Sequence, residues 1–114
     1  MNHLFIFNDS PHGAQRAYNG LRLAAALARK APVRVFLLGD GVLCGLAGLS
    51  PASADYHPQE MLRQIAATGA EIAACGTCME ARGIGTDALI PGVRRSTMDE
   101  LVAWTLECEK ILSF

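Results

Sequence analysis

The stretch Ala70-Glu71-Ile72-Ala73-Ala74 leads directly into Cys75-Gly76-Thr77-Cys78. The first five residues predict a short strand, and the next four place two thiols, spaced C-x-x-C, at the end of that strand. In α/β proteins, chemistry is concentrated at the carboxyl ends of the strands. The stretch therefore predicts an α/β fold and the position of its site. The two cysteines could carry sulfur, exchange a disulfide, bind a metal or simply pack in the core.

Strand and helix patterns alternate on either side of this stretch. Short continuous apolar runs closed by turn residues are typical of buried strands, whereas longer Ala- and Leu-rich segments are typical of helices. The strands are expected at 4–7, 33–38, 70–74 and 110–114, and the helices at 14–30, 59–68, 76–81 and from 96 onward. This order implies right-handed crossovers and a mostly parallel sheet with helices on both faces. We expect one domain spanning residues 1–114.

The last helix is predicted to begin with Ser96 as its N-cap and Asp99 in the capping-box position. One face of this helix carries four residues, namely Leu101, Trp104, Thr105 and Cys108. Trp104 is interpreted as a packing or interface anchor, and Cys108 as a core residue. The segment after it is expected to form an edge strand.

The composition limits the classes of partner. The formal net charge is -1, whereas nucleic-acid binding normally needs a basic face, and nothing favours a membrane surface. Hydrophobic residues make up 51% of the chain and the mean hydropathy is +0.23, which is apolar for a small monomer. We therefore expect a homo-oligomer with a buried interface between its subunits.

The N-terminal residues Met1-Asn2-His3 lack the basic region of a signal peptide, and the apolar stretches are too short to span a bilayer. A cytoplasmic location is expected, where the four cysteines are reduced at rest. In that compartment C-x-x-C is typical of catalysis, redox exchange or metal binding rather than of a structural disulfide.

Polar clusters follow three of the predicted strands. They are Asn8-Asp9-Ser10, Gly39-Asp40 and the stretch from Cys75 to Cys78. Because the carboxyl ends of parallel strands meet at one edge of a sheet, we expect the three clusters to converge. Asp40 is interpreted either as a cap of the following turn or as part of the site.

Within the third cluster, each residue has an expected role. Cys75 lies near the N-terminus of a short helical turn, where backbone N–H groups and the helix dipole lower the pKa of a thiol. Gly76 allows the backbone to approach closely, and Thr77 can donate a hydrogen bond to a thiolate. Arg82 lies about two turns further on, where its cation could stabilise a thiolate or an anionic substrate.

Other interpretations of the cysteines stay open. Cysteine is among the most buried residue types and often only fills the core. A zinc site would need two further ligands, which Cys44 and one histidine could supply, but there is no second C-x-x-C or H-x-x-x-H pattern, so no metal is expected. Cys44 is interpreted either as lying near the site or as buried.

The remaining polar residues are given surface interpretations. None of the histidines has a potential partner at a spacing that indicates a functional site. They are interpreted as surface or loop residues: His3, His12 and His57. Arg94 and Arg95 are interpreted as a solvated face. Because the glycines form neither G-x-G-x-x-G nor a Walker motif, nucleotide binding has no support, and no organic cofactor is expected.

Several segments together resemble a known family. They are Tyr18-Asn19-Gly20-Leu21-Arg22, Gly39-Asp40-Gly41-Val42, Tyr56 through Leu62, Cys75 through Cys78 followed by Arg82-Gly83-Ile84, and the C-terminal segment from Gly92 to Phe114. In their order and spacing they are similar to the DsrE/DsrF-like proteins, and within them to the YchN-like branch. The resemblance runs almost from end to end of the chain.

The resemblance implies a three-layer flavodoxin-like fold, homohexamers and cysteine-borne sulfur chemistry. In sulfur-relay members, one cysteine after the third strand carries sulfane sulfur as a persulfide, and Cys75 is its equivalent. Those members commonly lack a cysteine at the position of Cys78, whereas the YchN-like branch has both. A second thiol can attack a persulfide, release sulfide and leave a disulfide.

These observations together predict a sulfane-sulfur handling protein, as a persulfide carrier or sulfurtransferase. Cys75 is the expected nucleophile and Cys78 the resolving thiol or second sulfur site. Arg82 and backbone N–H groups, including those of Gly76 and Thr77, would hold the sulfur anion, and Asp40 would line the pocket, with a donor or acceptor protein as partner. Two alternatives are a dithiol–disulfide oxidoreductase using the same pair and a non-catalytic oligomeric binding protein with structural cysteines.

Overall fold

The computed structural model describes residues 2–12, 15–49 and 56–114. Within them, five strands form one sheet in the order β4-β3-β2-β1-β5, and every neighbouring pair is parallel. The strands are β1 (His3–Phe7), β2 (Val33–Leu37), β3 (Glu71–Cys75), β4 (Val93–Ser96) and β5 (Lys110–Ser113). The α-helices are α1 (Arg16–Ala28), α2 (Pro58–Ala67), α3 (Gly76–Ala81) and α4 (Met98–Glu107), and two 3-10 helices are η1 (Gly39–Gly45) and η2 (Thr86–Ala88).

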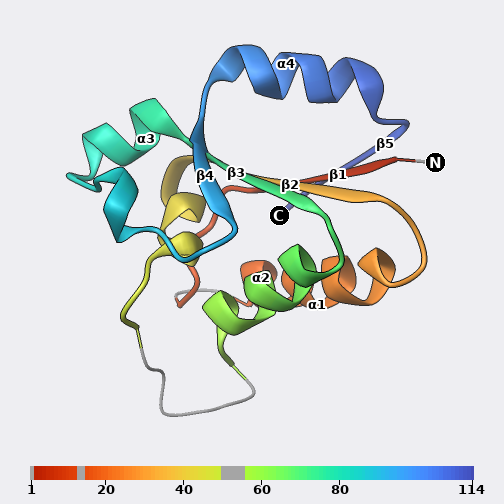
Figure 1. The fold of residues 1–114 in the computed structure, drawn as a ribbon, viewed down its shortest axis with the longest axis horizontal. Helices are drawn as coiled ribbons and strands as arrows, with labels where there is room; N and C mark the ends of the chain where they lie inside the picture. The colour runs from red at the N-terminus through yellow and green to blue at the C-terminus, as the bar shows by residue number, and fades with distance from the viewer. Residues whose placement is uncertain (1, 13–14, 50–55) are drawn as a thin grey trace.

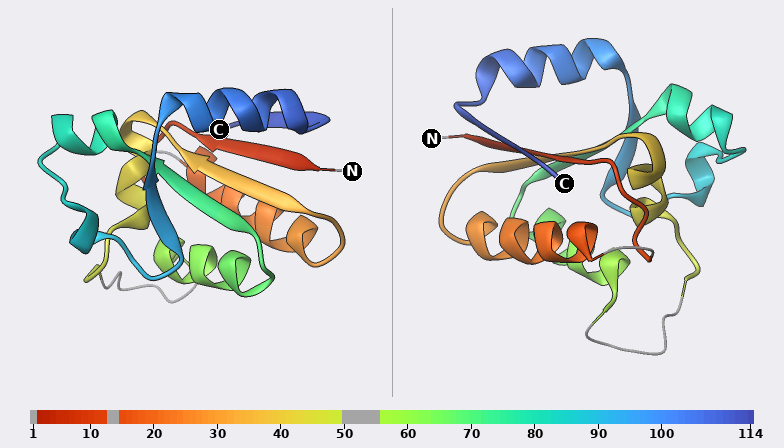
Figure 2. Two further views of the ribbon diagram at one scale, coloured as in Figure 1. Left: turned by 45° about the horizontal axis from the view of Figure 1, so that its top comes forward. Right: turned by 180° about the vertical axis from the view of Figure 1, so that it is seen from behind.

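The elements form three layers (Figure 1). Helices α1 and α2 cover one face of the sheet and α4 covers the other, while α3 lies beyond the carboxyl end of β3. Figure 2 shows the same arrangement from two further directions. The predicted three-layer flavodoxin-like α/β fold is confirmed, with the sheet wholly parallel in the described part of the chain.

Aromatic side chains fill the layer between the sheet and α1. The rings of Phe5, Phe7 and Phe114 stack on one another at centroid distances of 5.8–6.3 Å. Gly20 of α1 lies directly against them, since a Cβ there would come within 2.6 Å of Phe7 and Phe114 ring atoms. A glycine at this position therefore lets α1 approach the aromatic layer closely.

The opposite face of the sheet is covered differently. Trp104 of α4 is buried and meets Phe36 edge-on at 6.0 Å. The guanidinium groups of Arg34 and Arg94 lie 5.4 Å and 5.6 Å from the centre of the Trp104 ring, an arrangement that favours cation–π attraction. The interpretation of Trp104 as a packing residue is confirmed. Arg94 is not merely solvated, because it also forms ion pairs with Glu71 and Glu100.

The structure corrects the sequence prediction just before α4. No strand was expected at 93–96, where β4 pairs with β3 at the edge of the sheet. The N-cap of α4 is Thr97, whose hydroxyl accepts a hydrogen bond from the backbone N–H of Glu100, rather than Ser96 with Asp99. Ser96 is instead the last residue of β4, and the predicted capping box was wrong by one residue.

One of the histidine interpretations also changes. His3 lies on β1 with only 8% of its surface exposed, so its interpretation as a surface residue was wrong. His57 is the N-cap of α2, where Nδ1 accepts a hydrogen bond from the N–H of Glu60 at 3.2 Å. On α4, Leu101 and Cys108 are buried as expected, whereas Thr105 is exposed. Residues 50–55 of the predicted loop at 45–58 lie outside the described residues.

Candidate functional site

The C-x-x-C segment forms the junction between β3 and α3. Cys75 is both the last residue of β3 and the N-cap of α3, and Cys78 lies in the first turn of that helix. Strand β2 pairs with β3, and the loop that follows β2 begins η1 at Gly39 and Asp40. The second and third predicted clusters therefore meet at the carboxyl edge of the sheet, as expected.

The thiol of Cys75 is buried and surrounded by hydrogen-bond donors. Only 3% of the residue is exposed. Its Sγ lies 3.2 Å from the hydroxyl oxygen of Thr77 and accepts the backbone N–H of Cys78 at 3.5 Å. Burial acts to raise the pKa of Cys75, but hydrogen bonds from Thr77 and Cys78 outweigh it and hold the pKa below its usual range. The expected roles of Cys75 as an activated thiol and of Thr77 as a donor agree with this geometry.

The thiol of Cys78 has the opposite electrostatic character. Burial and the hydrogen bond that its thiol makes with Cys75 raise its pKa, although its Sγ also accepts the backbone N–H of Gly39 at 3.2 Å. Both cysteines are free thiols in this structure. Because one pKa is lowered and the other raised, Cys75 is the thiol that deprotonates first, and the S–H of Cys78 donates a hydrogen bond to its thiolate.

Arg82 reaches the site, where its charge acts to lower the pKa of Cys78, in the direction expected of a cation that stabilises a thiolate. Its Nε and Nη2 donate to the Oδ1 of Asp40 at 3.0 Å and 2.8 Å, and its Nη1 donates to the backbone oxygen of Cys78 at 3.0 Å. No contact between Arg82 and a sulfur atom is found in the described structure. The ion pair joins η1 to α3, so it positions the Gly39 N–H against Cys78.

Arg95 is a site residue that the sequence did not indicate. Its guanidinium group lies where a side chain of Gly76 would be, with Nε 2.8 Å from an ideal Cβ. It also donates to Glu80 of α3 at 2.6 Å. Arg95 thus connects β4 to both ends of α3, and the expected close approach at Gly76 is made by this side chain. This contact depends on the pairing of β4 with β3, which was not expected from the sequence.

The first predicted cluster lies beside the second, since an ideal Cβ of Gly39 would be 3.8 Å from the backbone oxygen of Asn8, but its polar side chains are paired elsewhere. Asp9 forms an ion pair with Arg16 at 2.8 Å, and Asn8 donates to Ser113 at 3.0 Å. Cys44 is fully buried beneath this cluster, 3.8 Å from the backbone oxygen of Asp9, and burial raises its pKa to about 12. Cys44 is therefore an unreactive thiol.

Within the described residues, no three His, Cys, Asp or Glu side chains are arranged to hold a metal ion.

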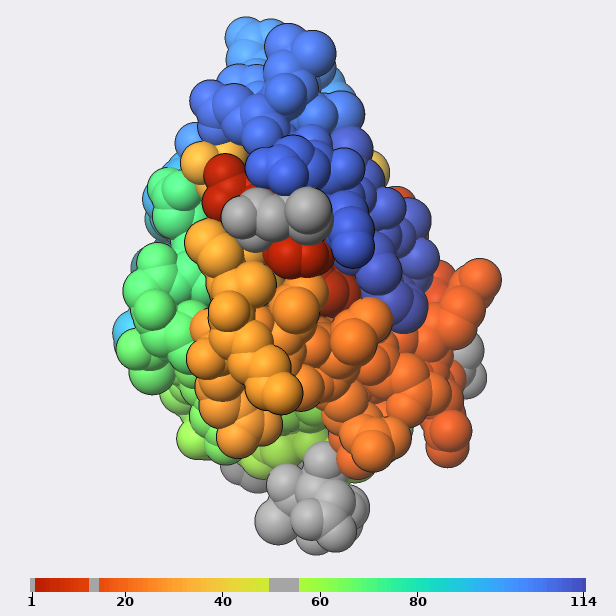
Figure 3. Space-filling view, turned by 90° about the vertical axis from the view of Figure 1, so that its right-hand side faces the viewer, coloured from red at the N-terminus to blue at the C-terminus, as the bar shows by residue number. Residues whose placement is uncertain are grey.

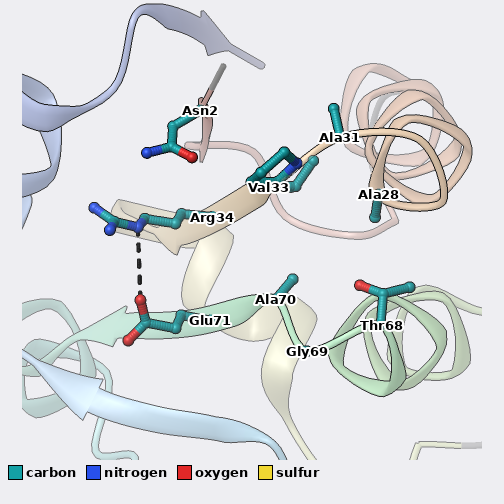
Figure 4. A pocket seen from close by; sticks show the side chains of 10 residues that line it. Asn2, Ala28, Ala31, Val33, Arg34, Thr68, Gly69, Ala70 and Glu71 are labelled. Atoms are coloured by element: carbon teal, nitrogen blue, oxygen red, sulfur yellow. Dashed lines mark ion pairs between the residues drawn. The ribbon is translucent and has the colours of Figure 1, made fainter.

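A hollow of about 410 Å³ lies at the opposite, amino end of the sheet (Figure 4). Its lining includes Arg34 and Glu71, which form an ion pair at 3.5 Å, together with Thr68 and Asn2. None of its lining residues is a cysteine. We place the candidate site at the C-x-x-C segment, because Cys75 lies there and its lowered pKa favours the reactive thiolate, whereas the pKa values of Cys44 and Cys108 are raised.

The hydrogen bond from Thr77 should be measurable in the reactivity of Cys75. Thr77→Val removes the hydroxyl and is expected to raise the pKa of Cys75, because the thiolate loses a donor. At neutral pH the rate of Cys75 alkylation should fall about two- to tenfold, the effect of one hydrogen bond. The pH profile of iodoacetamide labelling should move to higher pH, whereas Thr86→Val, on η2, should leave it unchanged. An identical profile in Thr77→Val would contradict the assigned hydrogen bond.

Comparison with known proteins identifies the family. The family model described as the DsrE/DsrF-like family matches residues 1–114. Protein YchN of Escherichia coli (strain K12) is 39% identical over 97% of both chains, and the crystal structure of this Escherichia coli protein superposes with a TM-score of 0.94 over 100% of this chain and 99% of the other. Protein TusC homolog of Aliivibrio fischeri is 29% identical over the full length of both chains.

These matches agree with the resemblance inferred from the motifs. The superposition covers the whole chain and is accompanied by 38% sequence identity. Among the residues that the structure describes, no helix is both long enough and apolar enough to cross a membrane. The protein belongs to the DsrE/DsrF-like family.

Proposed function

We propose that this protein handles sulfane sulfur, with Cys75 as the thiol that accepts it. The observation that carries the proposal is the environment of Cys75, a buried thiol at a strand end whose pKa is lowered by two hydrogen-bond donors. Membership of the DsrE/DsrF-like family and the similarity to the TusC homolog support a role in sulfur relay. The finer assignment, a persulfide carrier or sulfurtransferase, is part of the same proposal.

The transfer conserves atoms and electrons. The Cys75 thiolate attacks the outer sulfur of a donor persulfide, the donor S–S bond breaks, and the donor leaves as a thiolate that takes up a proton. The product is a persulfide on Cys75. An acceptor nucleophile then attacks the outer sulfur of this persulfide, and Cys75 leaves as a thiolate again. The donor and the acceptor are proposed to be proteins, and neither step needs an organic cofactor.

The reactivity of Cys78 determines whether the sulfur stays on Cys75 as a persulfide or is released as sulfide. Its attack on the inner sulfur of the Cys75 persulfide would expel sulfide and form a Cys75–Cys78 disulfide. Thiols attack as thiolates, and burial together with the hydrogen bond to Cys75 raises the pKa of Cys78. This electrostatic asymmetry favours the carrier over rapid release.

A dithiol–disulfide oxidoreductase is the second candidate function. It is favoured by the proximity of the pair, since the Sγ of Cys75 accepts the backbone N–H of Cys78 at 3.5 Å. In that mechanism Cys75 attacks a substrate disulfide, and Cys78 then resolves the mixed disulfide to leave the pair oxidised.

The variant Cys78→Ser separates the two candidates. A carrier should still gain sulfur at Cys75, to at least the wild-type level, because the resolving thiol is gone. An oxidoreductase should lose turnover completely. Intact-protein mass spectrometry after exposure of the reduced protein to a persulfide donor distinguishes a gain of sulfur from the loss of two hydrogens. Failure of the variant to load would refute the carrier, and no reaction in any variant would indicate a non-catalytic binding protein.

We further propose that the protein acts as a homo-oligomer in the cytoplasm, with the hexamer implied by family resemblance. The support is compositional, since 51% of the residues are hydrophobic and some large apolar side chains are exposed on the single chain. Size-exclusion chromatography with light scattering gives the mass directly, and a monomer would refute this part of the proposal.

A further inference from the structure

One guanidinium group fastens η1 to α3 beside the second thiol. The three hydrogen bonds that Arg82 donates reach Asp40 on η1 and the backbone oxygen of Cys78 on α3. These elements lie beyond the carboxyl ends of β2 and β3 in Figure 1, whereas Figure 3 shows the opposite end of the molecule, where β1 begins. The side chains of Asp40 and Arg82 are 61% and 30% exposed, so their ion pair adds little to the stability of the fold. Its effect lies in the geometry that it imposes on the site.

The residue before Asp40 supplies the contact with sulfur. The N–H of Gly39 donates to the Sγ of Cys78 at 3.2 Å. On one side of Gly39, Leu38 is anchored to β1 by its hydrogen bond to the backbone oxygen of Phe7 at 2.8 Å. On the other side, Asp40 is anchored to α3 by the ion pair. The direction of the Gly39 N–H is therefore fixed only while both anchors hold.

The ion pair acts on the second thiol and not on the first. The Sγ of Cys75 is contacted by the hydroxyl of Thr77 and the backbone N–H of Cys78, which both belong to the C-x-x-C segment itself. Burial and Cys75 raise the pKa of Cys78, whereas the Gly39 N–H and the charge of Arg82 lower it. Opening the ion pair should therefore change the reactivity of Cys78 and leave the donors to Cys75 in place.

We propose that Asp40 and Arg82 are positioning residues for the second thiol, Cys78. By holding the Gly39 N–H against its Sγ, they set the rate at which a persulfide on Cys75 is converted to sulfide. In this step the Cys78 thiolate attacks the inner sulfur of the persulfide, and the proton that it has lost passes to solvent. A Cys75–Cys78 bond forms, the bond to the outer sulfur breaks, and that sulfur leaves as hydrosulfide.

The step is balanced without a further reactant. The outer sulfur is reduced to sulfide, and the two cysteines are oxidised to a disulfide, so a single turnover needs no other reductant. A thiol attacks as its thiolate, and the N–H that stabilises this anion therefore favours the release of sulfide. The inference rests on the proposed function, because it concerns the fate of sulfur already bound to Cys75.

Two variants with opposite effects on charge separate positioning from simple electrostatics. Asp40→Asn removes a negative charge and Arg82→Gln a positive one, so charge alone would lower the pKa of Cys78 in the first variant and raise it in the second. Loss of positioning should raise it in both, because each variant releases the Gly39 N–H. In a Cys75→Ser background, iodoacetamide labelling of Cys78, followed by peptide mass spectrometry, should slow about two- to tenfold at neutral pH. The pH profile of labelling should move to higher pH in both variants.

Asp87→Asn is the matched control, because Asp87 is an exposed carboxylate on η2. Its labelling profile should equal that of Cys75→Ser alone. In a Cys78→Ser background, Asp40→Asn should leave the profile of Cys75 unchanged. A shift of the Cys78 profile to lower pH in Asp40→Asn, or no shift, would overturn the proposal, and a shifted Cys75 profile would count against it as well.

Sulfide release from the loaded protein distinguishes this inference from the proposed function. After loading with a persulfide donor and removal of that donor, Asp40→Asn should release sulfide about two- to tenfold more slowly than the wild type. The initial gain of sulfur should be the same in both proteins. Equal rates of release would overturn the inference and leave the proposed function intact. A wild-type protein that gains no sulfur would refute the proposed function, whereas the positioning of Cys78 would still be decided by the labelling profiles.

Discussion

Replacement of Cys75 by serine is expected to abolish sulfur loading completely. Serine preserves the size of the side chain and can still accept the N–H of Cys78, so the junction between β3 and α3 should remain folded. A hydroxyl is not ionised at neutral pH, however, and cannot form a persulfide. After incubation with a persulfide donor, intact-protein mass spectrometry should show only the unmodified mass of Cys75→Ser.

Cys108→Ser is the matched control for this experiment. Cys108 is also buried, but it terminates α4, and burial raises its pKa. The variant should load sulfur as the wild type does. Loading that persists in Cys75→Ser and disappears in Cys78→Ser would assign the sulfur to the second thiol, and would reverse the roles derived from the two pKa shifts.

Gly41→Ala is expected to destabilise the fold by at least about 3 kcal/mol. A Cβ at Gly41 would lie 1.9 Å from the backbone oxygen of Phe7 and 2.6 Å from its carbonyl carbon. These atoms belong to the backbone of the interior strand β1 and cannot rotate away as a side chain would. The methyl group can be accommodated only if η1 separates from the sheet, which also withdraws the Gly39 N–H from Cys78.

Gly69→Ala provides the control for the general cost of replacing a glycine. Gly69 has a φ of +92° and nothing within 4 Å of its ideal Cβ, so only backbone strain of about 1–2 kcal/mol is expected. Gly41 is not among the residues with positive φ, and its cost arises from the collision alone. Urea denaturation followed by far-UV circular dichroism gives both values. Equal losses in the two variants would contradict the close contact between η1 and β1.

Much of the fold follows from local patterns along the chain. The apolar runs at 4–7, 33–38 and 70–74 became β1, β2 and β3, since a continuous apolar run bounded by turn residues satisfies the requirements of a buried parallel strand. The residues of β4 did not show this pattern. Arg94 and Arg95 occupy its centre, and a short edge strand is stabilised by its pairing with a neighbour rather than by its own hydrophobicity.

The site could be predicted only in part. The position of Cys75 at a strand end, and Thr77 as a donor to it, follow from residues adjacent in sequence. The contacts of Arg82 could not be assigned, because its carboxylate partner Asp40 is 42 positions away, in a different loop. For the same reason, the contact of Arg95 with Gly76 could not be predicted from the sequence. An arginine close to a thiol in the sequence suggests an anion site. In the structure, however, Arg82 is already paired with Asp40 and Arg95 with Glu80.

The sequence by itself determined the α/β class, the family and the location of two thiols where β3 ends, because each depends on short-range patterns or on motifs in a set order. Only the tertiary structure decided how deeply the two thiols are buried and which distant groups contact Cys78. The N–H of Gly39 reaches Cys78 across 39 positions of the chain, and Thr77 and Cys78 both donate to Cys75. Burial raises the pKa of Cys78 and the Gly39 N–H opposes that shift, and both effects depend on the packing of neighbouring elements around β3 rather than on the order of residues.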